Sequence, residues 1–438
     1  MRAAIIGTGY VGLPTGTGFA ELGNDVVCID KLTEKIDMLN DGKITIFEEG
    51  LEELYQKNRR AGRLKFSSDI AQIEGADVVI IAVGTPTHPV TKEADLSCLF
   101  EAAEELAVYL KKYTVVALKS TVPVCTGAEV ERIISKKNPS ADFDLVSIPE
   151  FLREGFAVYD FFNPDRIVIG TDSARAIAVL NRLYAPFSPK TPILITTRNS
   201  AELIKYASNA FLAMKILYIN EISNFCEKCG AKIEEVAKGM GLDSRIGSKF
   251  LKPGPGYGGS CFPKDTLALT KMAKRYNVSL HLTDTAIEKN EERKLDMAHR
   301  IADIMGAQSA TAAILGLTYK SGTDDVRQSP AIDICKELLR LGISLRVYDP
   351  KGMQNAEEQL KDQVYYAADP YDAAANADAL VILTEWDEFA ELDFNRIRDL
   401  MQSAKIVDFR NILNSRQVEG FLYHRLGCGV HPCSLVNS

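Results

Sequence analysis

A glycine-rich turn near the N-terminus, Gly7-Thr-Gly-Tyr-Val-Gly12, limits the possible folds more strongly than any other stretch of the chain. An apolar run over residues 2–7 leads into the turn, and an apolar segment that ends near Gly23 follows it. A second apolar run, residues 26–29, ends on Asp30. Strand, glycine turn, helix, strand and acid in this order are typical of a dinucleotide-binding α/β unit. The sequence therefore predicts such a unit at the start of the chain.

The residue types in this motif favour NAD as the dinucleotide. The glycines let the backbone approach a pyrophosphate, and the amides at the start of the following helix attract its negative charge. Asp30 is expected to accept hydrogen bonds from ribose hydroxyls and to repel a 2′-phosphate, which selects NAD over NADP. Lys31, directly after it, would offset part of that repulsion.

The alternation of strands and helices continues to residue 196. Continuous apolar runs at residues 77–83 and 114–119 predict buried parallel strands, with a helical pattern between them at 96–111. Ligands of such sheets bind at the carboxyl ends of the strands. The residues with hydroxyl groups at these ends are either ligand contacts or ordinary turn residues: Thr85, Thr87, Ser120 and Thr121.

The pattern then changes to one long helix, from Asn199 to about Cys229, with apolar residues on nearly all sides. Asn199 and Glu202 are expected to cap its start. Lys205 and Asn209 are polar residues among apolar neighbours on this helix. Such a rod is expected to be buried nearly all round, to join two domains and to offer a face for self-association.

A second strand–helix–strand unit, without the glycine motif, follows the helices. Its predicted strands are residues 312–317, 344–348, 379–383 and 405–408. The sequence thus predicts an α/β protein with two Rossmann-like doubly wound parallel-sheet domains, at 1–196 and 301–438. A central helical domain over 197–300 joins them, and a ligand cleft is expected between the two sheets.

The stretch from Lys252 to Asp265, Lys-Pro-Gly-Pro-Gly-Tyr-Gly-Gly-Ser-Cys-Phe-Pro-Lys-Asp, holds too much glycine and proline for a regular helix or strand. It predicts a tight loop whose amides can approach a ligand closely. Cys261 near its end is a candidate nucleophile, because cations or amides near a thiol favour the reactive thiolate. The alternative is an inert structural cysteine beside a surface turn.

The length, net charge and composition of the chain exclude several classes of protein. At 438 residues it is expected to hold two or three domains. A net charge of −8 argues against nucleic-acid binding, and no apolar run approaches the roughly 20 residues that span a membrane. Nine scattered cysteines favour a reducing cytoplasm. No metal is expected, because zinc-site spacing is absent from both candidate groups, Cys226 with Cys229 and the tail residues His424, Cys428, His431 and Cys433.

Five motifs stand in a fixed order along the chain. They are Gly7-Thr-Gly-Tyr-Val-Gly12, Lys119-Ser-Thr-Val-Pro123, Pro149-Glu-Phe-Leu-Arg-Glu-Gly155, Asn163-Pro-Asp-Arg166 and Gly258-Gly-Ser-Cys-Phe-Pro-Lys-Asp265. In this order they resemble the nucleotide-sugar dehydrogenases, the UDP-glucose/GDP-mannose dehydrogenase family. The resemblance extends from Met1 to at least residue 410 and is strongest to the branch that acts on UDP-glucose. Two positions depart from it, since relatives usually carry Asn at Ile148 and Gly at Cys125.

The resemblance implies an NAD-dependent, twofold oxidation of UDP-glucose to UDP-glucuronate. Cys261 would add to the aldehyde formed first, giving a thiohemiacetal and then a thioester that water cleaves. A homodimer through the central helix is implied as well. The alternatives are the same chemistry on GDP-mannose or a UDP-N-acetylhexosamine, a one-step hydroxyacid dehydrogenase, and a nucleotide-sugar-binding protein without catalysis.

The residues that match the family's motifs fall into three groups. The implied catalytic residues are Cys261, Lys205, Asn209, Asp265, Glu150 and Thr121. The implied cofactor-binding residues are Gly7, Gly9, Tyr10, Val11, Gly12, Asp30, Lys35, Thr85, Thr121, Glu154, Lys264 and Arg327. The implied substrate-binding residues are Glu150, Phe151, Leu152, Lys205, Asn209, Arg245 from a partner subunit, Phe250, Leu251, Tyr257, Gly258 and Lys320. Lys205 and Asn209 would stabilise an oxyanion, and Glu150 would act as acid or base. If the segment with Glu150 and Glu154 is helical, both carboxylates share one face.

Overall fold

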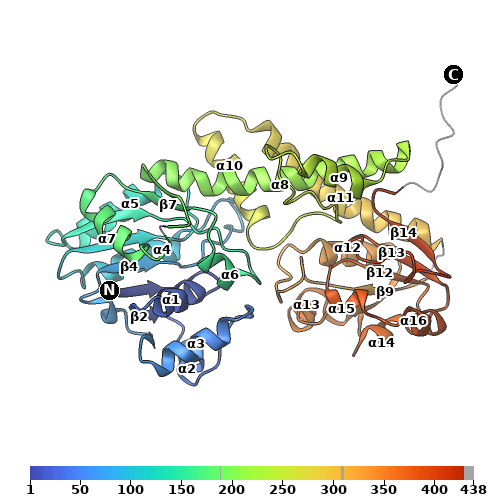
Figure 1. Cartoon of the computed structure of the whole chain (residues 1–438), viewed down its shortest axis with the longest axis horizontal. Helices are drawn as coiled ribbons and strands as arrows, with labels where there is room; N and C mark the ends of the chain where they lie inside the picture. The colour runs from blue at the N-terminus through green and yellow to red at the C-terminus, as the bar shows by residue number, and fades with distance from the viewer. Residues whose placement is uncertain (188, 307–309, 429–438) are drawn as a thin grey trace. The chain divides into compact units, whose positions relative to one another are not determined.

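The computed structural model describes residues 1–187, 189–306 and 310–428. Contacts divide the chain into two compact units. The first unit is Met1–Ser208 with Lys271–Val278, and the second is Asn209–Thr270 with the described residues from Ser279 onward. Each unit contains one sheet with helices packed on both of its faces (Figure 1).

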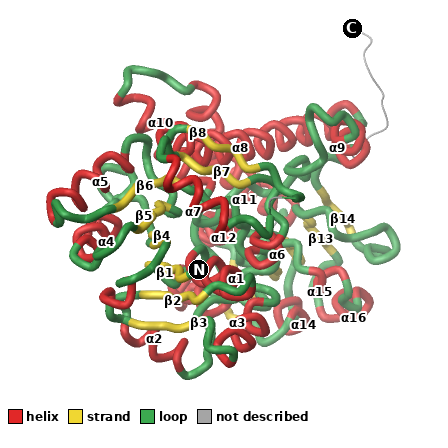
Figure 2. Tube along the Cα trace, turned by 60° about the vertical axis from the view of Figure 1, so that its left-hand side comes forward, coloured by secondary structure: helices red, strands yellow, loops and turns green. Residues whose placement is uncertain are grey.

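The first unit is built on an eight-stranded sheet with the order β3-β2-β1-β4-β5-β6-β7-β8 (strands yellow in Figure 2). Its strands are β1 (Arg2–Ile6), β2 (Asp25–Ile29), β3 (Leu64–Ser67), β4 (Val78–Ile81), β5 (Thr114–Leu118), β6 (Phe143–Ser147), β7 (Ile167–Gly170) and β8 (Ile193–Thr196). Neighbouring strands are parallel, except that β6 and β7 are antiparallel. The strands predicted at 26–29, 77–83 and 114–119 are confirmed as β2, β4 and β5.

Helices connect these strands and cover the sheet. They are α1 (Gly12–Glu21), α2 (Thr33–Asn40), α3 (Leu51–Arg60), α4 (Ser97–Ala107), α5 (Thr126–Lys137), α6 (Ala157–Phe162) and α7 (Ala174–Leu183), with a 3-10 helix at Ile70–Ile73. The helix predicted at 96–111 is confirmed as α4. The elements α2, α3 and β3 were not predicted from the sequence, and β3 extends the sheet beyond β2.

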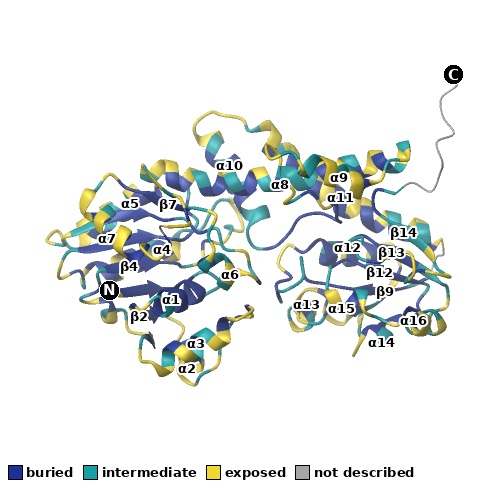
Figure 3. Cartoon of the chain, viewed as in Figure 1, coloured by how far each residue is buried: buried dark blue, intermediate teal, exposed yellow. Residues whose placement is uncertain are grey.

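Alternate residues of the central strands face opposite sides of the first sheet, and both sides are covered. In β1, Ala3 and Ile5 pack into a core with α1, α3 and α6, while Ala4 and Ile6 pack into a core with α4 and α5. All four side chains are buried. A sheet that is covered on both faces needs apolar residues at every position. This explains the continuous apolar runs in the sequence, which appear as buried strands in Figure 3.

The second unit is built on a six-stranded sheet, all parallel, with the order β11-β10-β9-β12-β13-β14. Its strands are β9 (Thr311–Leu315), β10 (Ser344–Tyr348), β11 (Tyr365–Tyr366), β12 (Ala379–Ile382), β13 (Lys405–Asp408) and β14 (Leu422–Arg425). The helices beside it are α12 (Pro330–Arg340), α13 (Met353–Leu360), α14 (Pro370–Ala374), α15 (Asp387–Ala390) and α16 (Phe394–Leu400). The predicted pair of parallel α/β sheets is confirmed.

The acid that ends the second strand is held in the same way in both units. Asp30 follows β2 and accepts hydrogen bonds from the amide and hydroxyl of Thr8, and Asp349 follows β10 and accepts the same pair from Thr318. Asp349 accepts further hydrogen bonds from Leu317, Lys351, Gly352 and Trp386. With an exposure of 1%, its carboxylate serves the internal structure of the second unit.

The remaining helices are α8 (Arg198–Cys229), α9 (Ile233–Gly241), α10 (Phe262–Arg275) and α11 (His281–Met305). The long helix predicted from Asn199 is confirmed as α8, but the prediction that it is buried nearly all round is wrong. Ile219 and Cys226 are buried, whereas Phe211, Tyr218 and Phe225 are 60%, 51% and 65% exposed. These three residues recur every seven positions and form an exposed apolar stripe on α8.

The condition that the segment with Glu150 and Glu154 is helical is not met, and the predicted cap of α8 by Asn199 and Glu202 is wrong. Residues 148–156 form a loop rather than a helix, so Glu150 and Glu154 do not share a helical face. α8 begins at Arg198, and Thr197 caps it by accepting a hydrogen bond from the Ser200 amide at 3.2 Å. The domain boundaries proposed at residues 196 and 300 remain predictions.

Among the described residues, no helix has both the length and the apolar composition needed to cross a membrane. Of the tail residues considered for metal binding, His431 and Cys433 lie outside the described part of the chain.

Candidate active site

The turn between β1 and α1 leaves space for a ligand at Gly9. A side chain at Gly7 would come within 2.5 Å of the Ala82 carbonyl oxygen, and one at Gly12 within 1.9 Å of the Gly7 carbonyl oxygen. At Gly9 a side chain would meet no other group within 4 Å. Packing therefore requires glycine at the first and last positions, while Gly9 borders open space at the amides that begin α1. Pyrophosphate binding needs such a turn, which also contains Tyr10 and Val11.

Thr8 orients the Asp30 carboxylate. The Thr8 amide and hydroxyl donate to one oxygen at 3.0 and 2.8 Å, and the Leu32 amide donates to the other at 3.2 Å. Lys35 Nζ lies 3.5 Å from the carboxylate. Burial opposes ionisation, but these hydrogen bonds and the Lys35 charge outweigh it and hold the Asp30 pKa below its ordinary value. An ionised, oriented carboxylate at this position suits a ribose of NAD.

Asp30→Ser is expected to weaken NAD binding by about 10- to 100-fold, since hydrogen bonds to a charged group contribute about 1.5–3 kcal/mol. NADP should gain relative to NAD, because serine does not repel a 2′-phosphate. Titration calorimetry with both dinucleotides measures the two dissociation constants. Asp25→Ser, at the exposed start of β2, is the control and should change neither. An unaltered ratio of the two constants in Asp30→Ser would contradict the assignment.

The loops after β4 and β5 are tied together at the carboxyl edge of the first sheet. The Thr85 hydroxyl donates to the Thr121 carbonyl oxygen at 2.8 Å, and the Ser120 hydroxyl donates to the Val83 carbonyl oxygen at 2.7 Å. Hydrogen bonds within these loops therefore account for the hydroxyl groups of Thr85 and Ser120. The Thr121 hydroxyl has no hydrogen-bond partner among the described residues and is available to a ligand.

Glu150 and Lys205 form a buried ion pair in the first unit. Glu150 follows β6, Lys205 lies on α8, and their charged groups are 2.9 Å apart with both side chains 5% exposed. The other oxygen of Glu150 accepts a hydrogen bond from the Leu152 amide at 2.5 Å. The Phe151 ring lies 3.6 Å from the Arg166 guanidinium and 5.5 Å from Lys205 Nζ. The structure thus brings two predicted catalytic residues together beside two predicted substrate contacts.

Lys119 is a third buried charge near this pair, and it is absent from the predicted site residues. It follows β5 directly and is 8% exposed. Burial lowers its pKa to about 8; the nearby Glu150 carboxylate raises it and the Lys205 charge lowers it. A lysine at the end of a continuous apolar strand was the available signal, because such a residue must be solvated or used.

Lys119→Met is expected to raise the melting temperature at about pH 7. Between about pH 8 and the ordinary lysine pKa, unfolded chains keep a proton on this residue that the folded protein has lost, so stability rises with pH. The variant should lack that rise. Scanning calorimetry at about pH 7 and about pH 9.5 compares it with Lys112→Met, an exposed control. A lower melting temperature at neutral pH, with the wild-type pH dependence, would disprove the expectation.

Glu48 fixes the loop that carries Glu150 and Glu154. Glu48 is 3% exposed, and its oxygens accept hydrogen bonds from the Gly155 amide at 2.8 Å and the Ala157 amide at 3.0 Å. These contacts, rather than the backbone hydrogen bonds of a helix, support the segment. No sequence pattern indicates this role of Glu48, because Glu48 and Gly155 are 107 positions apart.

The two departures from the family pattern lie in the first unit. Ile148 is buried in the apolar core of the sheet. Cys125 has φ 75°, a left-handed conformation that glycine adopts without strain. A cysteine there is therefore strained in a way that a glycine would not be.

In the second unit, Cys261 lies directly before α10 and is partly buried. Its Sγ is 3.6 Å from the Ser260 hydroxyl. Amides at the start of a helix favour a thiolate over a thiol. Asp265, 1% exposed, accepts hydrogen bonds at 2.6 Å from Asn209 Nδ2 and at 2.6 Å from Lys264 Nζ. The structure thus places Lys264 and Asp265, on the helix that follows the cysteine, in one cluster with Asn209 on α8.

Asn290 on α11, which the sequence did not indicate, holds the glycine-rich loop. Its Oδ1 accepts a hydrogen bond from the Tyr257 amide at 2.8 Å, and its Nδ2 donates to the Tyr257 carbonyl oxygen at 3.0 Å. Asn220 Oδ1 accepts a hydrogen bond from the Gly254 amide at 2.9 Å. The loop is irregular up to Cys261, as predicted, but residues 262–265, which were expected to belong to it, form the first turn of α10 instead. It contains or adjoins the predicted substrate contacts Phe250, Leu251, Tyr257 and Gly258.

Three predicted ligand-binding cations of the second unit contact residues close to them in sequence. Arg245, with its side chain 87% exposed, pairs with Asp243 at 2.6 Å. Arg327 donates to Asp325 at 2.8 Å, and Lys320 Nζ lies 5.5 Å from the ring centre of the preceding tyrosine. Their assigned ligand contacts remain predictions.

Models of one protein family match the chain in three consecutive segments. Residues 1–188 match the NAD binding domain of the UDP-glucose/GDP-mannose dehydrogenase family, residues 199–292 its central domain and residues 313–415 its UDP binding domain.

Individual proteins are similar over nearly the whole length. The chain is 51% identical to the UDP-glucose 6-dehydrogenase of Rhizobium meliloti (strain 1021), over 98% of this chain and 99% of that protein. It is 46% identical to UDP-glucose 6-dehydrogenase TuaD of Bacillus subtilis (strain 168), over 97% and 93%. The solved structure of a UDP-glucose dehydrogenase from the archaeon Pyrobaculum islandicum matches with a TM-score of 0.89 and 34% identity, over 97% and 96%. This chain therefore carries out an NAD-dependent oxidation of a nucleotide sugar and belongs to the UDP-glucose/GDP-mannose dehydrogenase family.

Proposed function

We propose that the chain oxidises UDP-glucose twice, to UDP-glucuronate, and that Cys261 holds the sugar between the two oxidations. The observation that carries this proposal is the position of Cys261 directly before α10, with Asn209, Lys264 and Asp265 bonded to one another on the first turns of that helix and on α8. The relatives at 51% and 46% identity have UDP-glucose in their names, which supports the choice of sugar.

The reaction needs a nucleophile because an aldehyde has no alcohol-like carbon from which a second hydride can leave. First, the primary alcohol of the sugar loses a proton and a hydride and becomes an aldehyde. The Cys261 thiolate then adds to the aldehyde carbon, and the new C–S bond gives a thiohemiacetal. Loss of a second proton and hydride converts it into a thioester. Water then breaks the C–S bond, which releases the carboxylate and restores the thiol. NAD supplies the hydride acceptor in both oxidations.

The buried Glu150–Lys205 pair supports the proposed handling of charge. Negative charge develops on the substrate oxygen in each step, and a cation stabilises it more strongly in a buried site than in water. We assign this role to Lys205, aided by the Asn209 amide. Glu150 acts as the acid or base, and the available Thr121 hydroxyl and the Asp265 carboxylate hold the hydrolytic water.

The exposed apolar stripe on α8 supports a homodimer. Phe211, Tyr218 and Phe225 expose more than half of their surface each, which a soluble monomer rarely does along one line. Arg245 is exposed enough to serve a partner subunit. A cytoplasmic location also belongs to the proposal, and none of the cysteines among the described residues forms a disulfide.

The proposal is tested by the yield of NADH from purified protein and limiting sugar nucleotide. UDP-glucose should give two NADH per molecule and a uronate product, whereas GDP-mannose and a UDP-N-acetylhexosamine should react far more slowly. A yield of one NADH per UDP-glucose would contradict the proposed second oxidation. No turnover of UDP-glucose alongside rapid turnover of another sugar would transfer the same chemistry to that sugar.

A further inference from the structure

Glu202 is a buried carboxylate surrounded by three hydrogen-bond donors. It lies on α8, one turn before Lys205, and is 3% exposed. One oxygen accepts a hydrogen bond from the Cys125 amide at 2.8 Å, and the other accepts from the Gly127 amide and the Ser147 hydroxyl, both at 3.0 Å. A side chain at Gly127 would come within 2.9 Å of the carboxylate. The predicted capping role of Glu202 is thus replaced by contacts to other elements.

These donors belong to the segments that carry catalytic residues of the first unit. The two amides begin α5, just after the loop with Thr121. The third donor, Ser147, is the last residue of β6 and shortly precedes Glu150. Glu202 itself lies on the helix of Lys205. One carboxylate therefore joins the three segments on which Thr121, Glu150 and Lys205 depend for their positions.

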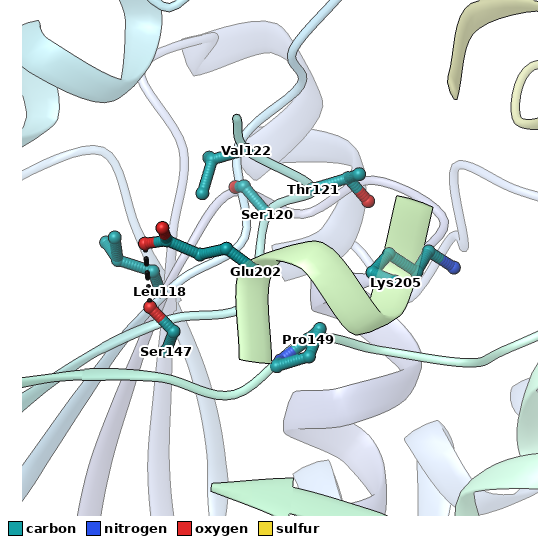
Figure 4. Close-up of a pocket in the computed structure, with 8 residues that line it drawn as sticks. All are labelled: Leu118, Ser120, Thr121, Val122, Ser147, Pro149, Glu202 and Lys205. Carbon is teal, nitrogen blue, oxygen red and sulfur yellow. Dashed lines mark hydrogen bonds between the residues drawn. The ribbon is translucent and has the colours of Figure 1, made fainter. Parts of the chain in front are cut away.

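There is little free space where these segments meet. A cavity of about 10 Å³, roughly the space of one water molecule, is lined in part by Thr121, Ser147, Glu202 and Lys205. Figure 4 shows the Glu202 carboxylate turned toward Ser147, while Lys205 extends away from it on the same stretch of helix. In such dense packing a change at Glu202 moves the neighbouring segments instead of being absorbed locally.

A buried carboxylate is a costly way to join segments if joining them is its only purpose. Burial raises the Glu202 pKa, although the hydrogen bonds from Ser147, Gly127 and Cys125 and the charge of Arg198 act in the opposite direction. Among the described residues Glu202 forms no ion pair that would offset this cost. A neutral side chain would avoid it, which indicates that the geometry held by the carboxylate has a use.

We propose that Glu202 is a positioning residue for thioester hydrolysis, which holds Thr121 and Glu150 in the correct arrangement with Lys205 without itself touching substrate or cofactor. The proposal rests on the hydrolytic roles proposed above for Glu150 and Thr121. It assigns to Glu202 an effect on the rate of one step rather than on the binding of either ligand.

Glu202→Gln and Glu202→Ala in the full chain test this role. Glutamine keeps the shape but turns an amide group toward one of the donors, and alanine removes all three hydrogen bonds. With UDP-glucose we expect kcat to fall by about 10-fold and about 100-fold, respectively, and KM to fall with it, so that kcat/KM stays within about threefold of wild type, because the slowed step follows both hydride transfers. Both NADH should still form in a rapid burst on mixing. Mass spectrometry of the quenched enzyme should then find Cys261 carrying the uronyl thioester in excess over wild type.

The chain offers a matched control. Glu131 on α5 pairs with Arg198 on α8 at 2.6 Å, so it joins the same two helices, but its side chain is 45% exposed. Glu131→Gln should keep kcat within about twofold of wild type. Ser147→Ala leaves Glu202 in place and removes one donor, and it should slow hydrolysis in the same way but less.

Retention of kcat within about twofold in both Glu202 variants would overturn the proposal. So would a loss of activity without the thioester on Cys261, or a loss matched by Glu131→Gln. If Glu202→Ala does not fold, Glu202→Gln and Ser147→Ala give the same decision. Failure of the proposed function is distinct, because the wild-type enzyme would then fail to give two NADH per UDP-glucose.

Discussion

Cys261→Ser is expected to lower the rate of UDP-glucuronate formation at least about 10³-fold. A serine hydroxyl is almost fully protonated near neutral pH and is a far weaker nucleophile than a thiolate, so the aldehyde is not captured. The affinity for NAD should be unchanged, because Cys261 is not among the residues predicted to bind the cofactor. Uronate is quantified by chromatography after overnight incubation, and NAD affinity by calorimetry.

Cys98→Ser is the matched control for this experiment. Cys98 is an exposed cysteine on α4, and its replacement should leave uronate formation at the wild-type rate. A Cys261→Ser enzyme that still forms uronate at a tenth of the wild-type rate or more would rule out the covalent intermediates.

Lys205→Met is expected to reduce both activity and stability. The rate should fall by about 10²- to 10³-fold, as when an oxyanion-stabilising donor is lost. The free energy of unfolding should fall by about 3 kcal/mol, because Glu150 is left as a buried charge without its partner at 2.9 Å. This is the lower end of the usual range, since the Lys119 charge remains nearby.

The double variant Glu150→Gln with Lys205→Met separates the two effects. It should recover most of the lost stability, because no unpaired charge remains, and none of the lost activity. Lys31→Met, which breaks an ion pair whose side chains are 67% and 58% exposed, should change stability by less than about 1 kcal/mol. If Lys205→Met unfolds at the same urea concentration as the wild-type protein, the buried ion pair does not contribute to the free energy of unfolding as argued.

The fold could be predicted from the sequence wherever burial produces a simple pattern of apolar residues. β1 and β4 are covered on both faces and are therefore continuously apolar, and the glycine turn of α1 has a fixed spacing. The exposed stripe on α8 was misjudged, because Phe211 and Ile219 are equally apolar in sequence although only Ile219 is buried in this chain. Composition reports what a side chain prefers to contact, and it does not report whether that contact lies within the same chain.

The candidate site likewise contains residues that could be predicted from the sequence and residues that could not. Gly9 and Asp30 belong to a local motif, and the structure gives them the expected surroundings. Glu48 and Asn290 support site loops through hydrogen bonds to backbone amides distant in sequence. Such contacts depend on the folded path of the chain, and any polar residue of suitable length can make them. No spacing rule identifies them in advance.

The Asp349 carboxylate is occupied by hydrogen bonds within the second unit, and this has a consequence for the order of events in each catalytic cycle. Among the described residues, the second sheet has no counterpart of Asp30 that could accept a ribose hydroxyl. In the double oxidation proposed above, two molecules of oxidised dinucleotide therefore visit one pocket in succession, the first leaving in its reduced form before the second arrives. A half-oxidised sugar that stayed merely adsorbed during this exchange would escape as a reactive aldehyde. In the proposed mechanism, the covalent bond to Cys261 prevents this loss.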